Sequence, residues 1–184
     1  MNSHVIAVIV GSAISLIAVY FAEYLRSKRN KKEKKIEVLQ NIKSLSRHIY
    51  RYAILEAQAD VFSNYYKASY ELTKDTYHRD EGNRKLRQYE EFKLKYLSLE
   101  IEWDKVIVSY SALIGNDSIF KKLTRRFEDY DAPRAKEFTN VNNIDELDEE
   151  RDKEDERLTR EIDATLRIYM EELVEHVENA IEKR

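Results

Sequence analysis

The sequence predicts an all-α protein in which one N-terminal transmembrane helix is followed by a cytoplasmic antiparallel three-helix coiled bundle plus a short fourth helix. Three observations lead to this fold class: an apolar run near the N-terminus, a scarcity of helix-breaking residues, and apolar side chains at helical spacing. Glycine occurs three times and proline once in 184 residues. We therefore divide the chain into a transmembrane anchor at 1–25, a basic juxtamembrane segment at 26–35 and a cytoplasmic helical bundle at 36–184.

The anchor is predicted from residues 5–25, VIAVIVGSAISLIAVYFAEYL, whose single carboxylate, Glu23, lies near one end. A helix of about 20 apolar residues crosses a hydrocarbon core of about 30 Å. Within the run, Ala7, Gly11 and Ser15 recur every four residues. Such a ridge of small side chains lets two spans approach closely, so we expect these three residues to support a homo-oligomer in the lipid bilayer. A chance recurrence of small residues is the alternative.

The orientation of the anchor is predicted from the charges that flank it. Residues 26–35 hold seven basic side chains and one acidic one, whereas residues 1–4 hold neither Lys nor Arg. The positive-inside rule then places the N-terminus outside and residues 26–184 in the cytoplasm, as a single-pass protein of the inner (plasma) membrane. A cleaved signal peptide is the rival interpretation, but it would carry its basic residues before the apolar run.

The remaining chain divides into four helical segments, because turn residues and polar clusters occur at 78–84, 115–118 and 130–143. The short break HRDEGNR at 78–84 predicts that the first two cytoplasmic helices are antiparallel. No Gly or Pro lies between Gly11 and Gly82, so the first of them can continue the anchor without a break.

Apolar stripes support each long segment, and we expect the last helix to pack against both earlier ones. The stripe residues are Val38, Ile42, Leu45, Ile49, Tyr52, Leu55, Ala59, Phe62, Tyr66 and Tyr70 in the first; Tyr89, Phe92, Tyr96, Leu99, Trp103, Val106, Tyr110 and Leu113 in the second; and Leu158, Ile162, Leu166, Tyr169, Leu173, Val177 and Ile181 in the last. Many are tyrosines, which favours a wide bundle with hydroxyls at its rim over an aromatic pocket for a nucleobase.

Catalytic and metal-binding patterns are not evident. His78, Arg79 and Asp80 spell part of a kinase motif but lack its companions, and we interpret them as a turn. Glu172 and His176 do not form the paired Glu-x-x-His of a di-iron bundle. The acidic run at 145–157 lacks the spacing of a calcium loop. We expect no cofactor, no metal and no catalytic residue, and we predict that the protein is not an enzyme. Hydrolysis by carboxylates and histidine ranks last among the functions considered.

Two groups of basic residues form a candidate anion site. Because the helix after Leu113 turns back, both groups are expected at the membrane-proximal base of the bundle. The residues are Lys43, Arg47, His48 and Arg51 in the first group and Lys121, Lys122, Arg125 and Arg126 in the second. A solvated or lipid-facing basic surface is the plainer interpretation.

We expect a membrane protein whose bundle self-associates and binds a protein partner or a signal. The alternative is a membrane effector gated by an anionic small ligand, such as a signalling nucleotide, at that basic surface. No DNA partner is expected, since the net charge is −3 and no DNA-reading motif is evident.

Overall fold

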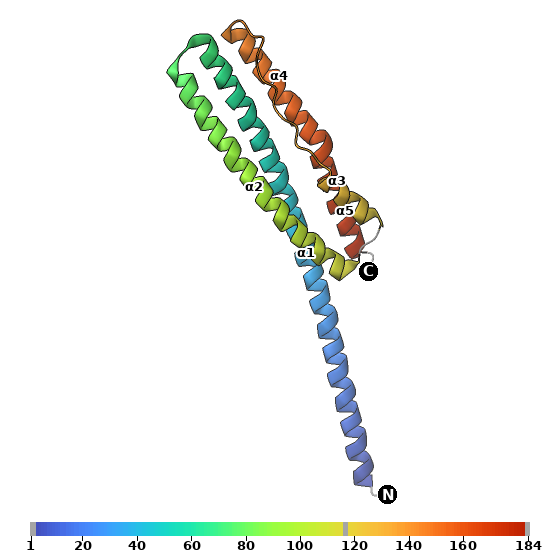
Figure 1. Cartoon of the computed structure of the whole chain (residues 1–184). Coiled ribbons are helices and arrows are strands. Elements are labelled where there is room, and N and C mark those ends of the chain that lie inside the picture. The colour runs from blue at the N-terminus through green and yellow to red at the C-terminus, as the bar shows by residue number, and fades with distance from the viewer. Residues whose placement is uncertain (1–2, 116–117, 183–184) are drawn as a thin grey trace.

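The computed structural model describes residues 3–115 and 118–182, with side chains from residue 19 onward except at positions 114 and 128. These residues form an all-helical protein without strands, as predicted. The elements are α1 (Ser3–Thr73), α2 (Thr76–Ile114), α3 (Ser118–Glu128), α4 (Ile144–Ile162), the π-helical turn η1 (Asp163–Arg167) and α5 (Ile168–Glu182). Because α4, η1 and α5 follow one another without a break, they act as one long final helix (Figure 1).

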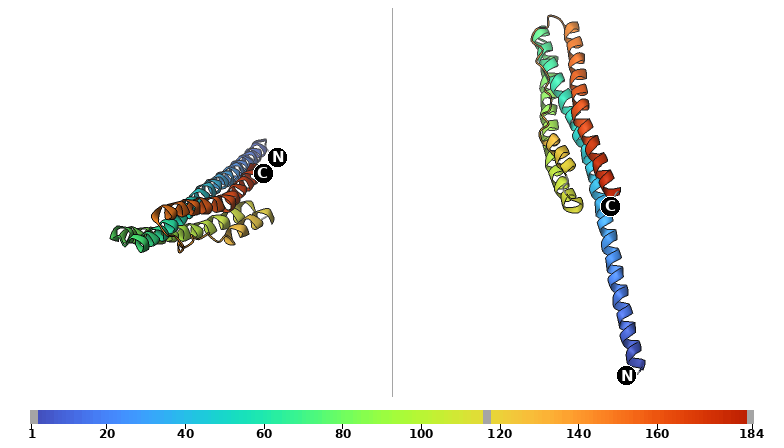
Figure 2. Two further views of the ribbon diagram at one scale, coloured as in Figure 1. Left: turned by 90° about the horizontal axis from the view of Figure 1, so that it is seen from above. Right: turned by 90° about the vertical axis from the view of Figure 1, so that its right-hand side faces the viewer.

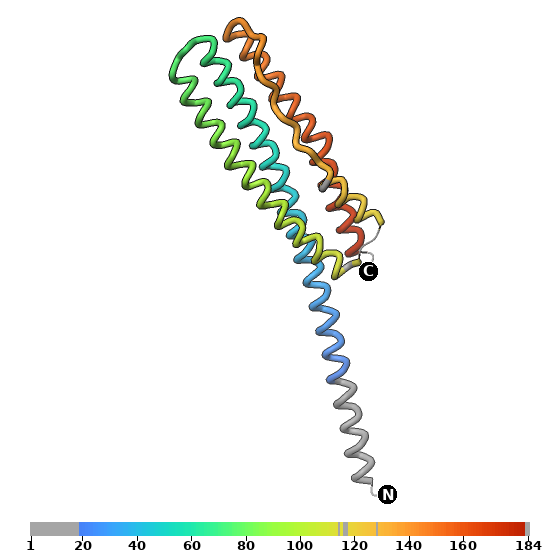
Figure 3. Tube along the Cα trace, in the orientation of Figure 1, coloured from blue at the N-terminus to red at the C-terminus, as the bar shows by residue number. Residues whose placement is uncertain are grey.

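The first helix is continuous over 71 residues and reaches far beyond the bundle. Its first core residue is Val38, and residues 3–37 form what we call the shaft. Figures 1 and 3 show the shaft projecting alone from one end of the bundle, which we call the base. Every residue from 19 to 34 is exposed.

The structure gives no support to the predicted transmembrane span. Within the part of the chain that is described, no helix combines the length and the apolar character that a membrane crossing requires. Residues 5–18 of the predicted span lie outside the described side chains, and so do Ala7, Gly11 and Ser15.

The turn between the first two helices lies earlier than the sequence indicated. α1 ends at Thr73 and α2 begins at Thr76, so the predicted break at 78–84 is wrong, and His78, Arg79 and Asp80 lie in the first turns of α2. Lys74 makes the reversal with a left-handed φ of 56°, and the Asp75 side chain caps α2 by accepting a hydrogen bond from the Tyr77 N–H. A two-residue turn closed by a capping side chain needs no glycine, so Gly82 does not mark the turn and lies inside α2.

The bundle is built around α1, which α2 covers on one side and α4 and α5 cover on another. Figure 2 shows α2 running back along α1 and the final helix lying on the other side of α1. The predicted stripes form the core: Trp103 and Tyr110 of α2 are fully buried, as are Ile162 and Leu166 near the π-turn. Burying such side chains contributes roughly 1.5–3 kcal/mol each, which stabilises the bundle.

The final helix does not pack against both earlier helices in the way the sequence predicted. It lies along α1, and its α5 part also contacts α3, but no extended contact joins it to α2 in the described residues. α3 touches α2 through two ring pairs: the Trp103 and Phe127 rings are 5.3 Å apart between centroids, and the Tyr110 and Phe120 rings are stacked at 4.1 Å. The predicted breaks at 115–118 and 130–143 are confirmed, since helices end at Ile114 and Glu128 and α4 begins at Ile144.

The connection between α3 and α4 is an extended segment, residues 129–143, which we call the strap. It runs from the base of the bundle to the end that carries the α1–α2 turn (Figure 1). Phe138, within the strap, has a buried side chain. Pro133, the only proline in the sequence, also lies in the strap. The strap therefore closes part of the bundle without forming a helix.

Candidate functional site

The basic residues predicted on α1 lie at the base, and two of them line a groove between α1 and α5. Lys43 is ion-paired with Glu178. Arg47 lines a groove of about 440 Å³ beside Glu171 and Glu175 of α5. Three basic and three acidic side chains line this groove, so its walls carry no net charge; they are Lys43, Arg47, Arg167, Glu171, Glu175 and Glu178.

The other two predicted residues of α1 are outside that groove. The His48 ring nitrogen Nδ1 is 2.7 Å from the carbonyl oxygen of Ser44, one turn earlier in the same helix. Arg51 is exposed. Neither residue forms a described contact with α3.

The basic residues on α3 lie on a different side of α5. Arg126 donates a hydrogen bond to Glu172 at 2.8 Å, and its guanidinium lies 5.2 Å from the centre of the Tyr169 ring. Lys121, Lys122 and Arg125 are exposed. Arg47 and Arg126 are thus beside the same turn of α5, at the expected level, but α5 separates them. The structure therefore divides the predicted anion surface into two groups, with carboxylates beside both Arg47 and Arg126.

A cavity of about 200 Å³ lies between α1, α2 and the strap. Its walls combine carboxylates, tyrosines and two cations: Glu56, Asp60, Glu100, Asp131, Tyr89, Tyr96, Tyr130, Lys93 and Arg134. Burial raises the pKa of the Glu56, Asp60 and Glu100 carboxyls, and it also raises the pKa of the Tyr96 and Tyr130 hydroxyls. The sequence does not predict this cavity, because the strap that forms one of its walls has no periodic pattern of apolar residues.

The polar groups of this region hold the strap in place. The Ala135 N–H donates to Asp60 Oδ2 at 3.0 Å, and the Lys136 N–H donates to Glu154 Oε1 at 2.9 Å. Arg157 donates to the Arg134 carbonyl at 3.0 Å and is ion-paired with Glu154 at 2.7 Å. Throughout residues 3–115 and 118–182, no three acidic or histidine side chains are grouped so that they could hold a metal ion.

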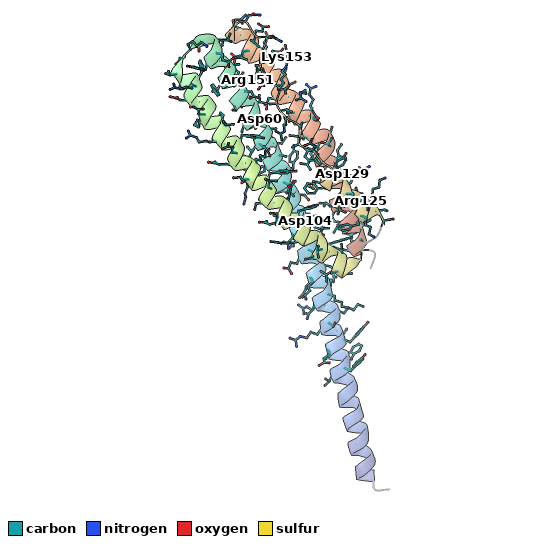
Figure 4. All side chains as sticks on the ribbon, in the orientation of Figure 1. Asp60, Asp104, Arg125, Asp129, Arg151 and Lys153 are labelled. Carbon is teal, nitrogen blue, oxygen red and sulfur yellow. The ribbon has the colours of Figure 1, made fainter. Side chains whose placement is uncertain are left out.

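A second apolar stripe runs along α2 on the side opposite the core. Leu94, Ile101 and Val108 are 68%, 60% and 68% exposed, and Leu97 is also exposed. These four residues follow a heptad spacing of their own, out of phase with the core stripe. Leu86 is also exposed on α2, nearer the α1–α2 turn and beside the line of this stripe. Figure 4 marks Asp104, which lies on α2 between Ile101 and Val108.

The stripe of α2 could have been found in the sequence. Leu94, Leu97, Ile101 and Val108 advance by three, four and seven residues, as a buried seam would. The aromatic stripe of the same helix is the stronger of the two patterns. A helix with two apolar faces, one of them uncovered by its own bundle, marks a surface for interaction.

The shaft carries a second uncovered apolar surface where its described side chains begin. Val19, Tyr20, Phe21, Tyr24 and Leu25 are all exposed, and the basic residues of 26–35 follow directly. Large aromatic side chains beside a basic segment are typical of a membrane–water interface.

Comparisons of the chain with protein-family models, curated proteins and solved structures found no match.

Proposed function

We propose that this protein is a membrane-anchored scaffold whose helical bundle self-associates and binds a protein partner or a signal. The observation that carries the proposal is the uncovered end of the shaft. Tyr20, Phe21 and Tyr24 are exposed together on a helix that no other described element accompanies. Water would leave these rings unfavourably hydrated, whereas the headgroup region of a bilayer accommodates their amphipathic character.

The sequence supplies the rest of the argument for an anchor. Residues 5–25 form an apolar run, and the basic residues of 26–35 lie immediately after it. Each Lys or Arg near an anionic leaflet contributes about 1 kcal/mol of attraction. Because α1 continues from Ser3 to Thr73, a shift of the anchor would be transmitted to the bundle through one rigid helix.

Self-association is the second part of the proposal, and the exposed stripe of α2 supports it. Isolated exposed aliphatic residues are ordinary on a protein surface, but a stripe along several turns of one helix marks a contact surface. Seams at heptad spacing can be shared between chains. The small residues Ala7, Gly11 and Ser15 would add a second contact between spans.

The anchor is tested by its topology. The chain has no cysteine, so Ser3→Cys and Ser63→Cys each introduce a unique thiol. An impermeant maleimide should label position 3 in intact cells and position 63 only after lysis. Labelling of position 63 in intact cells would reverse the orientation. Release of the wild-type chain from membranes by alkaline washing would end the anchor proposal.

An effector gated by an anionic ligand is less favoured by the geometry. Lys43 and Arg126 are paired with Glu178 and Glu172, and Arg47 lies among carboxylates. A phosphate would have to displace these carboxylates or overcome their repulsion. Replacing both Arg47 and Arg126 by Gln should accordingly leave nucleotide binding and attraction to anionic vesicles close to wild type.

A further inference from the structure

We infer that the exposed stripe of α2 binds the same stripe of a second copy of this chain, with the two α2 helices antiparallel. This inference rests on the self-association in the proposed function and adds its surface and its orientation. The stripe is defined as Leu94, Leu97, Ile101 and Val108. It lies opposite the buried Trp103 and Tyr110, so a second copy can approach it without disturbing the core.

The charges within the stripe decide the orientation. In heptad terms, Arg87, Glu90 and Asp104 occupy further positions along the line of the stripe. A parallel two-fold pair places every residue opposite its own copy. Arg87 would then face Arg87, Glu90 would face Glu90 and Asp104 would face Asp104. Three layers of like charge would oppose such a dimer.

An antiparallel pair removes these like-charged layers: it pairs Arg87 with Asp104 and places Glu90 opposite Ile101 of the second copy. With the two-fold axis at the middle of α2, between residues 95 and 96, Leu94 faces Leu97 of the second copy. In the same register Arg87 faces Asp104 of the second copy, and the symmetry repeats both contacts. α2 spans Thr76–Ile114, so this axis lets the two helices overlap over almost their whole length. Both Arg87 and Asp104 are exposed in the single chain and hence available.

Two charges that flank the stripe, Lys93 and Glu100, line the cavity between α1, α2 and the strap, so they do not decide the register. Arg84 would face Lys105 of the second copy, which is a like-charged contact. Arg84 is already bound by Glu81 at 2.5 Å, and this carboxylate offsets that repulsion.

In the antiparallel dimer, the two anchors lie far apart. The shaft leaves each bundle at the base, and the antiparallel pair puts the two bases at opposite ends (Figure 1). Each dimer would therefore carry one anchor at each end. Such a dimer joins two bilayer surfaces that face each other, while the ridge of Ala7, Gly11 and Ser15 would join copies within one bilayer.

Charge reversal in the full-length protein tests the pairing. Arg87→Asp alone and Asp104→Arg alone should each weaken dimerisation in detergent by about tenfold, because each creates two repulsive contacts per dimer. The double variant should restore dimerisation. The two residues are 17 positions apart, about 25 Å along the helix, so rescue cannot arise within one chain. Lys95→Asp and Glu102→Arg reverse exposed charges off the stripe and serve as matched controls.

Cysteine pairing gives an independent readout in the cysteine-free chain. Chains with Arg87→Cys mixed with chains with Asp104→Cys should form a mixed disulfide under mild oxidation. Val108→Cys alone should not, since position 108 would lie about 37 Å from its copy in the antiparallel pair. Proteoliposomes that contain the wild-type chain should cluster, and those with Arg87→Asp should not.

The outcomes separate this inference from the proposed function. Failure of the double variant to restore dimers, or an efficient Val108→Cys homodisulfide, would overturn the antiparallel orientation while self-association stands. Wild-type dimerisation by a Leu94→Glu, Ile101→Glu variant would show that another surface joins the copies. A wild-type chain that stays monomeric at all concentrations would contradict self-association itself and leave the stripe to a different protein.

Discussion

The carboxylate of Asp60 on α1 accepts a hydrogen bond from the N–H of Ala135 in the strap, with an N to O distance of 3.0 Å. The next N–H along the chain, that of Lys136, donates to Glu154 on α4 at 2.9 Å. Two adjacent amides are thus held by carboxylates from two different helices. Because the strap belongs to no helix or sheet, side chains must satisfy its buried donors. These contacts make the strap a fixed part of the fold.

Glu154→Ala should destabilise the protein by about 2–3 kcal/mol. Glu154 is 2% exposed and accepts hydrogen bonds from both Lys136 and Arg157. Its removal leaves the partly buried N–H of Lys136 and the guanidinium of Arg157 without this acceptor. Glu156 forms an exposed ion pair with Arg160, so Glu156→Ala should cost less than about 1 kcal/mol. Urea unfolding of the two variants measures the difference, and equal costs would show that the strap is not held by Glu154.

The cavity carboxylates should make stability depend on pH in the direction opposite to Glu154. Burial raises the pKa of Glu56 in the folded protein above its ordinary value of 4.5. Its contribution to stability is therefore present below pH 4.5 and lost as the pH rises through the raised pKa. Hydrogen bonding from Arg157 lowers the pKa of Glu154, so that contribution is present above pH 4.5 and lost as the pH falls through the lowered pKa.

Glu56→Gln should accordingly raise the Tm at pH 7 and lose this advantage as the pH approaches 4.5. The glutamine has no charge to desolvate in the cavity. Glu154→Gln should lower the Tm at pH 7, and its deficit should shrink in acid. Thermal unfolding at several pH values compares the two variants. A Glu56→Gln variant that is less stable than wild type at pH 7 would show that its charge is favourably paired.

Gly82→Ala should stabilise the protein by about 0.5–1 kcal/mol, because Gly82 lies inside α2 and alanine has the higher helix propensity. A Cβ at this position would meet the Cβ of Tyr66 at 3.4 Å, an ordinary van der Waals contact. Gly115 provides the matched control: its φ of 102° is strained for any L side chain, so Gly115→Ala should destabilise the protein by about 1 kcal/mol or more. Denaturant midpoints give both values. A lower midpoint for Gly82→Ala than for wild type would indicate that the added methyl group does not fit against α1.

Gly82 also illustrates which parts of the fold the sequence could predict. The helices and their buried stripes follow from apolar spacing, which is a local signal, and Trp103 and Leu166 lie in the core as expected. The sequence places the α1–α2 turn near Gly82, because glycine is a stronger turn signal than aspartate. The capping role of Asp75 is visible only once the left-handed conformation of Lys74 is known.

Local patterns in the sequence do not predict the strap or the arrangement of basic residues at the base. The strap is fixed by contacts between residues as far apart as Asp60 and Ala135, and no spacing rule encodes them. Counting residues along antiparallel helices placed Arg47 and Arg126 at the right level. It could not show that α5 would lie between them and supply a carboxylate such as Glu172.

Trp103→Ala should be among the most damaging single substitutions, at about 3–5 kcal/mol. Trp103 is 1% exposed, and its ring lies 5.3 Å from that of Phe127, so it joins α2 to α3. Truncation would leave a cavity at that junction and loosen α3. Val108→Ala shortens an exposed side chain on the same helix and should change the stability of the single chain by less than about 0.5 kcal/mol.

A double-mutant cycle with Phe127→Ala isolates the contact between the two rings. The coupling energy should be about 0.5–1.5 kcal/mol, as for other aromatic pairs in edge or tilted contact. Urea unfolding at a protein concentration where dimers dissociate keeps assembly out of the measurement. If Trp103→Ala costs no more than Val108→Ala, the buried seam does not hold α3 on α2. The position of α3 would then depend on its contacts with α5 instead.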